Sequence, residues 1–324
     1  MKNTTVIGTH PLCRDNASPY LLVWITTGAI ALSDFIWLRE SGIRLVIGIG
    51  LQTVVSITAI TLVILWTHYR ARGDRHPPSR WGARLQNLAF TGKWMLTLAA
   101  FCTATSILSS LSITVAAPLI DDQLIRIDRI EGFDWLRSYR WSLGHPLLSR
   151  VFHAAYASGL AQMIAVPVIL GIAGRRTEMV HHITRLMLAI LLCLTIATVF
   201  PAASAFLHFH IADPGTSDTV STFFPLRDGS LRIIDLTASQ GLVSMPSLHA
   251  TMAVLFTYAL RRVAYLAHAA TALNALMLAS TITQGGHYLC DVLAGVALAG
   301  LTIVLVKRVR PRVPLRLRHA AGAA

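Results

Sequence analysis

Residues 288–306 read YLCDVLAGVALAGLTIVLV and contain a single charged side chain, that of Asp291. About 20 consecutive apolar residues in a helix cross the hydrocarbon core of a bilayer, so this stretch predicts a transmembrane helix. The whole chain has the same character, because 54% of its 324 residues are hydrophobic and only 13% are charged. A water-soluble fold of this size could not bury so much apolar surface, and a disordered chain requires a polar composition. We therefore expect an all-α, polytopic membrane helix bundle.

Apolar segments that could cross the membrane recur along the chain. The eight candidates are residues 20–38, 43–66, 94–120, 151–173, 186–207, 246–260, 263–283 and 288–306. We expect the last six to form a six-helix core over residues 94–306. Residues 1–93 then form a leader, two accessory helices (the first an uncleaved anchor) and a basic loop, and residues 307–324 form a basic tail.

Positive charge is distributed unevenly between the two sides of this predicted bundle. The leader, the 67–93 loop, the 174–185 and 261–262 turns and the tail together carry 19 of the 28 Lys and Arg residues. Because positively charged loops stay in the cytoplasm, we expect both termini there. Arg outnumbers Lys 25 to 3, which is typical of a GC-rich bacterial genome and favours a bacterial inner membrane. The net charge of +13 is dispersed in short clusters between apolar runs, whereas a nucleic-acid-binding protein concentrates charge on one surface, so we exclude nucleic acid as a partner.

Two long loops, residues 121–150 and 208–245, are then expected outside the cytoplasm. The first is mixed in charge and has Leu124, Ile127 and Trp135 available for an apolar side, which predicts an interfacial helix on the outer leaflet. The second is rich in Pro, Gly, Ser and Asp, which predicts an irregular cap.

Reactive side chains interrupt the apolar runs at two places, each at the outer end of a predicted helix. These are SMPSLH at residues 244–249 and QGGHYLCD at residues 284–291. The 38 residues from His249 to His287 would measure some 57 Å as helix, which equals one pass across the bilayer and one pass back. The two histidines are therefore expected at the same depth.

Local sequence at both places favours anion binding. Pro246 suits the first turn of a helix with Ser244 as a possible N-cap, while Gly285 and Gly286 allow the backbone to approach a ligand. Two helix N-termini would then offer free N–H groups and positive dipole ends to an anion such as phosphate.

His287 and Asp291 are four residues apart, hence on one helical face. The carboxylate can therefore hold one ring nitrogen and leave the other directed outward, as in pairs of a catalytic base and its orienting acid. An acid inside the membrane region is costly and usually functional, which favours a chemical role for Asp291.

PSLH at residues 246–249 and HYLCDV at residues 287–292 resemble the second and third signature motifs of the type 2 phosphatidic acid phosphatase superfamily. The PSLH form is similar to the branch of the inositol phosphorylceramide synthases (aureobasidin-resistance proteins), and the second motif also resembles sphingomyelin-synthase-like phosphotransferases. The resemblance implies a phosphatidic-acid-phosphatase-like core of six helices and a metal-independent lipid phosphatase or phosphotransferase.

The resemblance also implies a role for each matching residue. His287, oriented by Asp291, would attack phosphorus and form a phosphohistidine intermediate. His249 would protonate the leaving oxygen and then act as a base on an incoming hydroxyl group or water. Ser247 would hydrogen-bond a phosphate oxygen. No metal ion or other cofactor is required.

Two departures from the family pattern affect phosphate binding. The Ser-Arg pair that should precede the third-motif histidine is Ser280 and Thr281, so its arginine is missing, and the Lys and Arg-Pro of the first motif are absent from the outer loop. A less positive site suits a phosphodiester better than a phosphomonoester and so favours headgroup transfer between lipids. The replacement cations suggested by location are Arg126, Arg129, Arg137 and Arg140.

Other polar residues have more than one interpretation. Asp34 is either functional or packed against a neighbouring helix, and Tyr156 and Gln162 either approach the pocket or pack between helices. Four of the histidines outside the motifs are assigned to turns or loops without a metal-binding role: His181, His182, His208 and His210.

The leading interpretation is an integral-membrane lipid phosphotransferase or phosphatase that acts at the outer leaflet on a phospholipid or isoprenoid phosphate. Water or a lipid alcohol would be the acceptor, and the sequence leaves the substrate and the oligomeric state open. The alternatives are a membrane transporter and a catalytically silent protein of the same fold. A transporter requires ionisable residues along a central path, whereas residues 94–120, 151–173 and 186–207 contain no Asp, Glu, Lys or Arg.

Overall fold

The computed structural model describes residues 17–46, 80–211, 217–236 and 244–308, with four single positions between residues 62 and 69. Its helices are α1 (Ala17–Ser41), α3 (Arg80–Ile113), α4 (Asp121–Ile130), α5 (Trp135–Leu143), α6 (Pro146–Ile172), α7 (Arg176–Val199), α8 (Ala205–His208), α9 (Ser217–Arg227), α10 (Leu248–Leu260), α11 (Leu266–Gln284) and α12 (Leu289–Arg308). Two short strands, β1 (Arg44–Val46) and β2 (Ile233–Asp235), pair in parallel with Arg44 opposite Ile233. The predicted all-α membrane class is therefore confirmed.

Six of the described helices, α1, α3, α6, α7, α11 and α12, are long and apolar enough to cross a membrane, whereas α10 is a shorter apolar helix of 13 residues. Most of the predicted segment 43–66 lies outside the described residues, and its first residues form β1 instead of a helix.

Two predicted helix boundaries were wrong. The segment predicted at 94–120 is a helix from Arg80 to Ile113, and the segment predicted at 186–207 is a helix from Arg176 to Val199. Hydropathy marks the apolar part of a helix, while the backbone hydrogen bonds continue through the polar residues that precede it. The residue before a proline disfavours the helical conformation, and α7 accordingly ends at Val199, just before Phe200 and Pro201.

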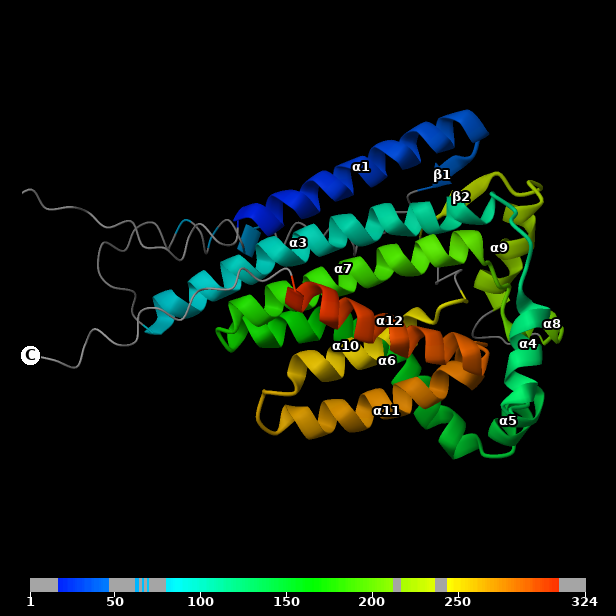
Figure 1. Cartoon of the computed structure of the whole chain (residues 1–324). Helices are drawn as coiled ribbons and strands as arrows, with labels where there is room; N and C mark the ends of the chain where they lie inside the picture. Colours follow the sequence, from blue (N-terminus) through cyan, green and yellow to red (C-terminus); the bar gives the residue numbers. More distant parts are fainter. Residues whose placement is uncertain are drawn as a thin grey trace, which may run out of the picture.

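α10 lies at the centre of the bundle, in contact with α6, α7, α11 and α12 (Figure 1). Met252, Leu255 and Phe256 of this helix are buried in the main hydrophobic core. α1 packs along α3, and the rings of Tyr20 and Trp94 meet edge to face at a centroid distance of 5.4 Å. The element that carries His249 is therefore enclosed by four helices.

The two long loops that were expected outside the cytoplasm contain more regular structure than predicted. The first was expected to form a single helix and the second an irregular cap. Residues 121–143 form two short helices, α4 and α5, because Gly132 adopts a left-handed φ of +77° and Asp134 caps α5 by accepting a hydrogen bond from the Arg137 backbone N–H. Leu124 and Trp135 are buried inside the protein with Phe206 and Tyr288 instead of forming the apolar side of an interfacial helix, and Ile127 is 45% exposed. The predicted cap contains α9 and β2, so its Gly, Pro, Ser and Asp content was misinterpreted.

One end of the bundle holds α4, α5, α8 and the turn from α11 to α12, whereas α1 begins and α12 ends at the opposite end (Figure 1). The two sequence motifs that carry chemistry therefore lie toward the end that α4 and α5 cover.

Candidate active site

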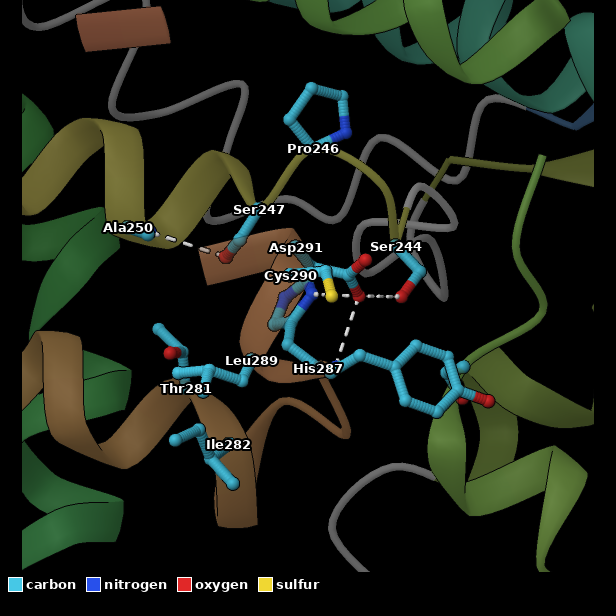
Figure 2. Close-up of polar contacts among 12 residues, drawn as sticks. Ser244, Pro246, Ser247, Ala250, Thr281, Ile282, His287, Leu289, Cys290 and Asp291 are labelled. Carbon is cyan, nitrogen blue, oxygen red and sulfur yellow. Dashed lines mark hydrogen bonds and ion pairs between the residues drawn. The ribbon is translucent and has the colours of Figure 1, made fainter. Parts of the chain in front are cut away.

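His287 and Asp291 form the centre of the candidate site. His287 precedes α12 and Asp291 lies in its first turn, so that His287 Nδ1 and Asp291 Oδ2 are 3.5 Å apart (Figure 2). Both residues are buried, with 4% and 0% of their surface exposed. A carboxylate beside Nδ1 favours the tautomer that carries its proton there, which leaves the lone pair on Nε2 for chemistry.

Ser244 reaches the same carboxylate from the other motif. Its hydroxyl group donates a hydrogen bond of 2.9 Å to Asp291 Oδ2, and the backbone N–H of Tyr288 donates one of 3.1 Å to the same oxygen. Figure 2 shows Asp291 between Ser244 and His287. Ser244 is therefore not the helix cap that the sequence suggested. Its hydroxyl group belongs instead to the network that holds Asp291.

Ser247 is the residue that caps α10. Its backbone is extended, its Oγ accepts a 3.3 Å hydrogen bond from the Ala250 N–H, and Pro246 precedes the cap instead of occupying the first helical turn. The Ser247 backbone N–H donates to the Asp291 carbonyl oxygen at 3.0 Å. The cap thereby joins the start of α10 to the first turn of α12, and its hydroxyl hydrogen is left for another acceptor.

The start of α10 lies very close to α12. A Cβ atom added at Gly295 would lie 2.4 Å from the Ser247 carbonyl oxygen, and Thr251 Oγ1 donates a 2.9 Å hydrogen bond to the Gly295 carbonyl oxygen. Only a glycine allows this approach, so Gly295 sets the distance between the two motifs.

Tyr156 of α6 connects the two histidines. Its ring stacks on His249 with a centroid distance of 4.0 Å and an interplanar angle of 20°. A Cβ atom at Gly285 would lie 2.9 Å from Tyr156 Cε2 and 2.7 Å from His287 Cδ2, so both rings adjoin the same point. The structure thus brings His249 and His287 to one place, as the hairpin spacing predicts, and it assigns Tyr156 to the site.

The N-terminus of α12 is occupied by a carboxylate from α4. Asp128 accepts hydrogen bonds from the backbone N–H groups of Leu289 at 2.9 Å and Cys290 at 3.0 Å, and it is 2% exposed. These N–H groups were expected to be free for phosphate, and that expectation was wrong because a protein anion already satisfies them. Any phosphate at this site has to be held by other donors.

Asp121, also in α4, anchors the residue that follows His287. It accepts hydrogen bonds from the Tyr288 hydroxyl group at 2.9 Å and from the backbone N–H of Ala203 at 2.9 Å. The Tyr288 phenol is therefore a hydrogen-bond donor to a buried carboxylate.

Sequence reasoning missed both aspartates of α4. Asp121 and Asp128 lie seven residues apart, on the buried helical face that also carries Leu124 and Ile125. That shared face was the available signal, since a charged residue on the apolar side of a short helix requires a buried partner.

The two positions at which the family pattern has Ser-Arg contribute no positive charge in this chain. The hydroxyl groups of Ser280 and Thr281 donate to the carbonyl oxygens of Met277 and Leu278 in their own helix, both at 2.7 Å. The carbonyl oxygen of Thr281 accepts the backbone N–H groups of Gly285 at 3.0 Å and His287 at 3.3 Å. This pair therefore ends α11 and orients His287. The four arginines considered as replacements, Arg126, Arg129, Arg137 and Arg140, are all exposed on α4 and α5.

Three other polar residues are buried in the helices. Gln162 accepts a 3.0 Å hydrogen bond from Asn274 and so joins α6 to α11. His182 was placed in an exposed turn, but it is 1% exposed within α7. Asp34 is 2% exposed, and its carboxylate has no hydrogen-bond partner among the described residues.

The fold and the site define a helical membrane protein in which two histidines from neighbouring helices meet around a buried carboxylate. A sequence profile of the PAP2 superfamily matches residues 122–305, more than half of the chain. The chain therefore belongs to this superfamily, which is the family that the two motifs resemble. No curated protein and no solved structure matches the chain significantly.

Proposed function

We propose that the protein is a membrane lipid phosphatase or phosphotransferase that works through a phosphohistidine on His287. Membership of the PAP2 superfamily supports a phosphatase-type enzyme. The observation that carries the proposal is the pairing of His287 Nδ1 with Asp291 Oδ2 at 3.5 Å, next to the stacked rings of Tyr156 and His249.

In the first step the lone pair of His287 Nε2 attacks phosphorus while the bond from phosphorus to the leaving oxygen breaks. His249 donates its proton to that oxygen, so the product leaves as a neutral alcohol. Asp291 offsets the positive charge that develops on His287. Ser247, whose hydroxyl group serves only as an acceptor among the described residues, donates its hydrogen to a phosphate oxygen.

In the second step the hydroxyl group of water or of a lipid alcohol attacks the phosphohistidine. His249, now neutral, accepts the hydroxyl proton, and the bond between phosphorus and His287 Nε2 breaks. His287 and His249 thereby return to their starting states. This balance requires no metal ion, oxidant or other cofactor.

Transfer to a lipid alcohol is the finer proposal. The PSLH form of the second motif, similar to inositol phosphorylceramide synthases, supports it, as does the absence of arginine at Thr281. A site with little positive charge neutralises a singly charged phosphodiester more readily than a phosphomonoester. The charge asymmetry of the loops supports a location on the periplasmic side of a bacterial inner membrane.

The test is a trapping experiment with purified protein in detergent. Wild-type protein mixed with phosphatidic acid labelled with ³²P should form a protein-bound label that survives alkali and is lost in acid, as expected of a phosphohistidine. His287→Ala should give no label, and His249→Ala should slow both labelling and release. His153→Ala, which changes an exposed histidine of α6, is the matched control and should label like the wild type.

A second arm separates hydrolysis from transfer. With phosphatidylinositol as donor, the addition of ceramide should yield a lipid product that carries the phosphorylated headgroup. Equal turnover in the wild type and both histidine variants, with any of these lipids, would contradict the proposal.

A further inference from the structure

A cleft of about 310 Å³ lies between α5, α6 and α11, beside the candidate active site. Its lining includes Phe133, Arg137, Trp141, Phe152, Ile282 and Thr283. Three of these side chains are aromatic and one is cationic, a combination that suits the interface between membrane and water.

Residues that line the cleft are close neighbours in sequence of residues at the paired histidines. Phe152 lies one helical turn from Tyr156, the residue that stacks on His249, so both are on one face of α6. On α11, Thr283 comes just before Gly285 and His287, and Figure 2 shows Ile282 at the end of this helix, beside the turn that carries His287. The Trp135 indole N–H holds this wall by donating a 3.0 Å hydrogen bond to the Ile282 carbonyl oxygen.

Thr283 is the unexpected residue of this wall. It is 5% exposed, and its Oγ1 has no hydrogen-bond partner in the part of the chain that the structure describes. Other threonines in the transmembrane helices satisfy their hydroxyl group with a carbonyl oxygen of the preceding turn, as Thr271 and Thr281 do. A buried hydroxyl group is normally paired, so the unpaired hydroxyl group of this cleft-lining residue indicates a missing oxygen or N–H partner.

Arg137 provides the positive charge at the same cleft. Of the four arginines considered from the sequence, it is the one in the lining described above, and Ser138 lines the cleft next to it. An anionic lipid approaching the histidines from the membrane interface along this cleft would meet its guanidinium group.

We propose that this cleft holds the lipid side of the substrate, directly beyond its phosphate, and that it selects lipids with an oxygenated backbone. The inference rests on the proposed function and narrows its substrate class. Thr283 binds the first polar oxygen past the phosphate, the aromatic residues cover the start of the apolar chains, and Arg137 attracts the anionic group. Glycerophospholipids and sphingolipids have such oxygens, whereas isoprenoid phosphates have only hydrocarbon beyond the phosphate.

The test compares two lipid phosphates that differ in this feature, dioctanoyl phosphatidic acid and farnesyl phosphate. Thr283→Val removes the hydroxyl group at nearly constant volume and should raise the KM for dioctanoyl phosphatidic acid about five-fold, while the KM for farnesyl phosphate stays unchanged. Thr271→Val, at an exposed position of the same helix, is the matched control. Arg137→Gln should raise the KM for phosphatidic acid about ten-fold, and Arg140→Gln, on the same short helix, should leave it unchanged.

A binding arm keeps this inference separate from the proposed function. In His287→Ala protein, native mass spectrometry should show tighter binding of dioctanoyl phosphatidic acid than of farnesyl phosphate, and Thr283→Val should remove the difference. If no lipid is turned over but this difference is found, the proposed reaction is wrong and the cleft assignment stands. Equal binding of the two lipids, or equal effects of Thr283→Val on both, would overturn the inference.

Discussion

At the level of single residues, the buried carboxylate of Asp291 joins the two sequence motifs. Its Oδ2 faces His287 Nδ1 and accepts hydrogen bonds from the Ser244 hydroxyl group and the Tyr288 backbone N–H. A buried charge with three such neighbours fixes the ring orientation and the tautomer of His287 together.

Asp291→Asn should therefore lower kcat on the order of 100-fold or more while KM changes little, because the variant keeps the size of the side chain but loses its charge. An amide can also donate to His287 Nδ1 and so favour the wrong tautomer. The measurement is steady-state turnover of a short-chain phosphatidic acid, with thermal melting as the control for folding. A kcat within about three-fold of the wild type, in a protein that melts normally, would mean that Asp291 is only structural.

Tyr156 is a positioning residue, because its ring contacts His249 by stacking at 4.0 Å. Tyr156→Phe keeps the ring and should retain activity, whereas Tyr156→Leu should lower kcat about ten-fold for lipid substrates, since His249 is then free to turn. p-Nitrophenyl phosphate has a leaving group that needs little protonation, so the loss for this substrate should be smaller. The same loss for both substrates would show that Tyr156 acts on something other than the proton donor.

At the level of helices, the two motifs meet because α10 and α12 approach each other closely. The Ser247 carbonyl oxygen occupies the space that a side chain at position 295 would need. α4 contributes from outside the hairpin, since Asp128 caps α12 and Asp121 holds Tyr288. The site is thus built from contacts between elements far apart in sequence.

Gly295→Ala should separate α10 from α12 and cost about 1–3 kcal/mol of stability. The expected result is a lower melting temperature and an at least ten-fold loss of lipid turnover, because both His249 and Ser247 move with α10. Gly300→Ala is the matched control on the same helix, since a Cβ atom there would meet nothing within 4 Å. If Gly295→Ala and Gly300→Ala have similar melting temperatures and activities, the close contact between α10 and α12 is not required for the site.

At the level of the whole molecule, the sequence predicts much of the architecture and part of the site. Apolar composition predicts the membrane helices, and the spacing between His249 and His287 predicts that a helical hairpin returns the second histidine to the first. Those inferences depend on local composition and on helix geometry, both of which can be read from a single segment.

The contacts of Tyr156, Asp128 and Thr283 were not predictable in the same way. Each depends on which face of a helix turns toward a partner that is distant in sequence, as when Asp128 accepts from Leu289, 161 residues away. Helix ends were misplaced for a related reason, since hydropathy does not record where backbone hydrogen bonds stop. Ser244 was predicted to cap α10 in place of Ser247 because serine is a good cap at either position and only the backbone conformation distinguishes the two.

The orientation of the bundle in the membrane gives a last prediction. The turn between α4 and α5 lies at the end of the bundle that holds the site, and the turn between α10 and α11 lies at the opposite end (Figure 1). Since positive charge gathers on the side expected in the cytoplasm, Glu131→Cys should react with a membrane-impermeant maleimide in intact cells. Tyr265→Cys, at a residue that is 93% exposed, should react only after the membrane is permeabilised. The unsubstituted protein controls for its own cysteines, and the reverse pattern of labelling would place the histidines on the cytoplasmic side and exclude lipids of the outer leaflet as substrates.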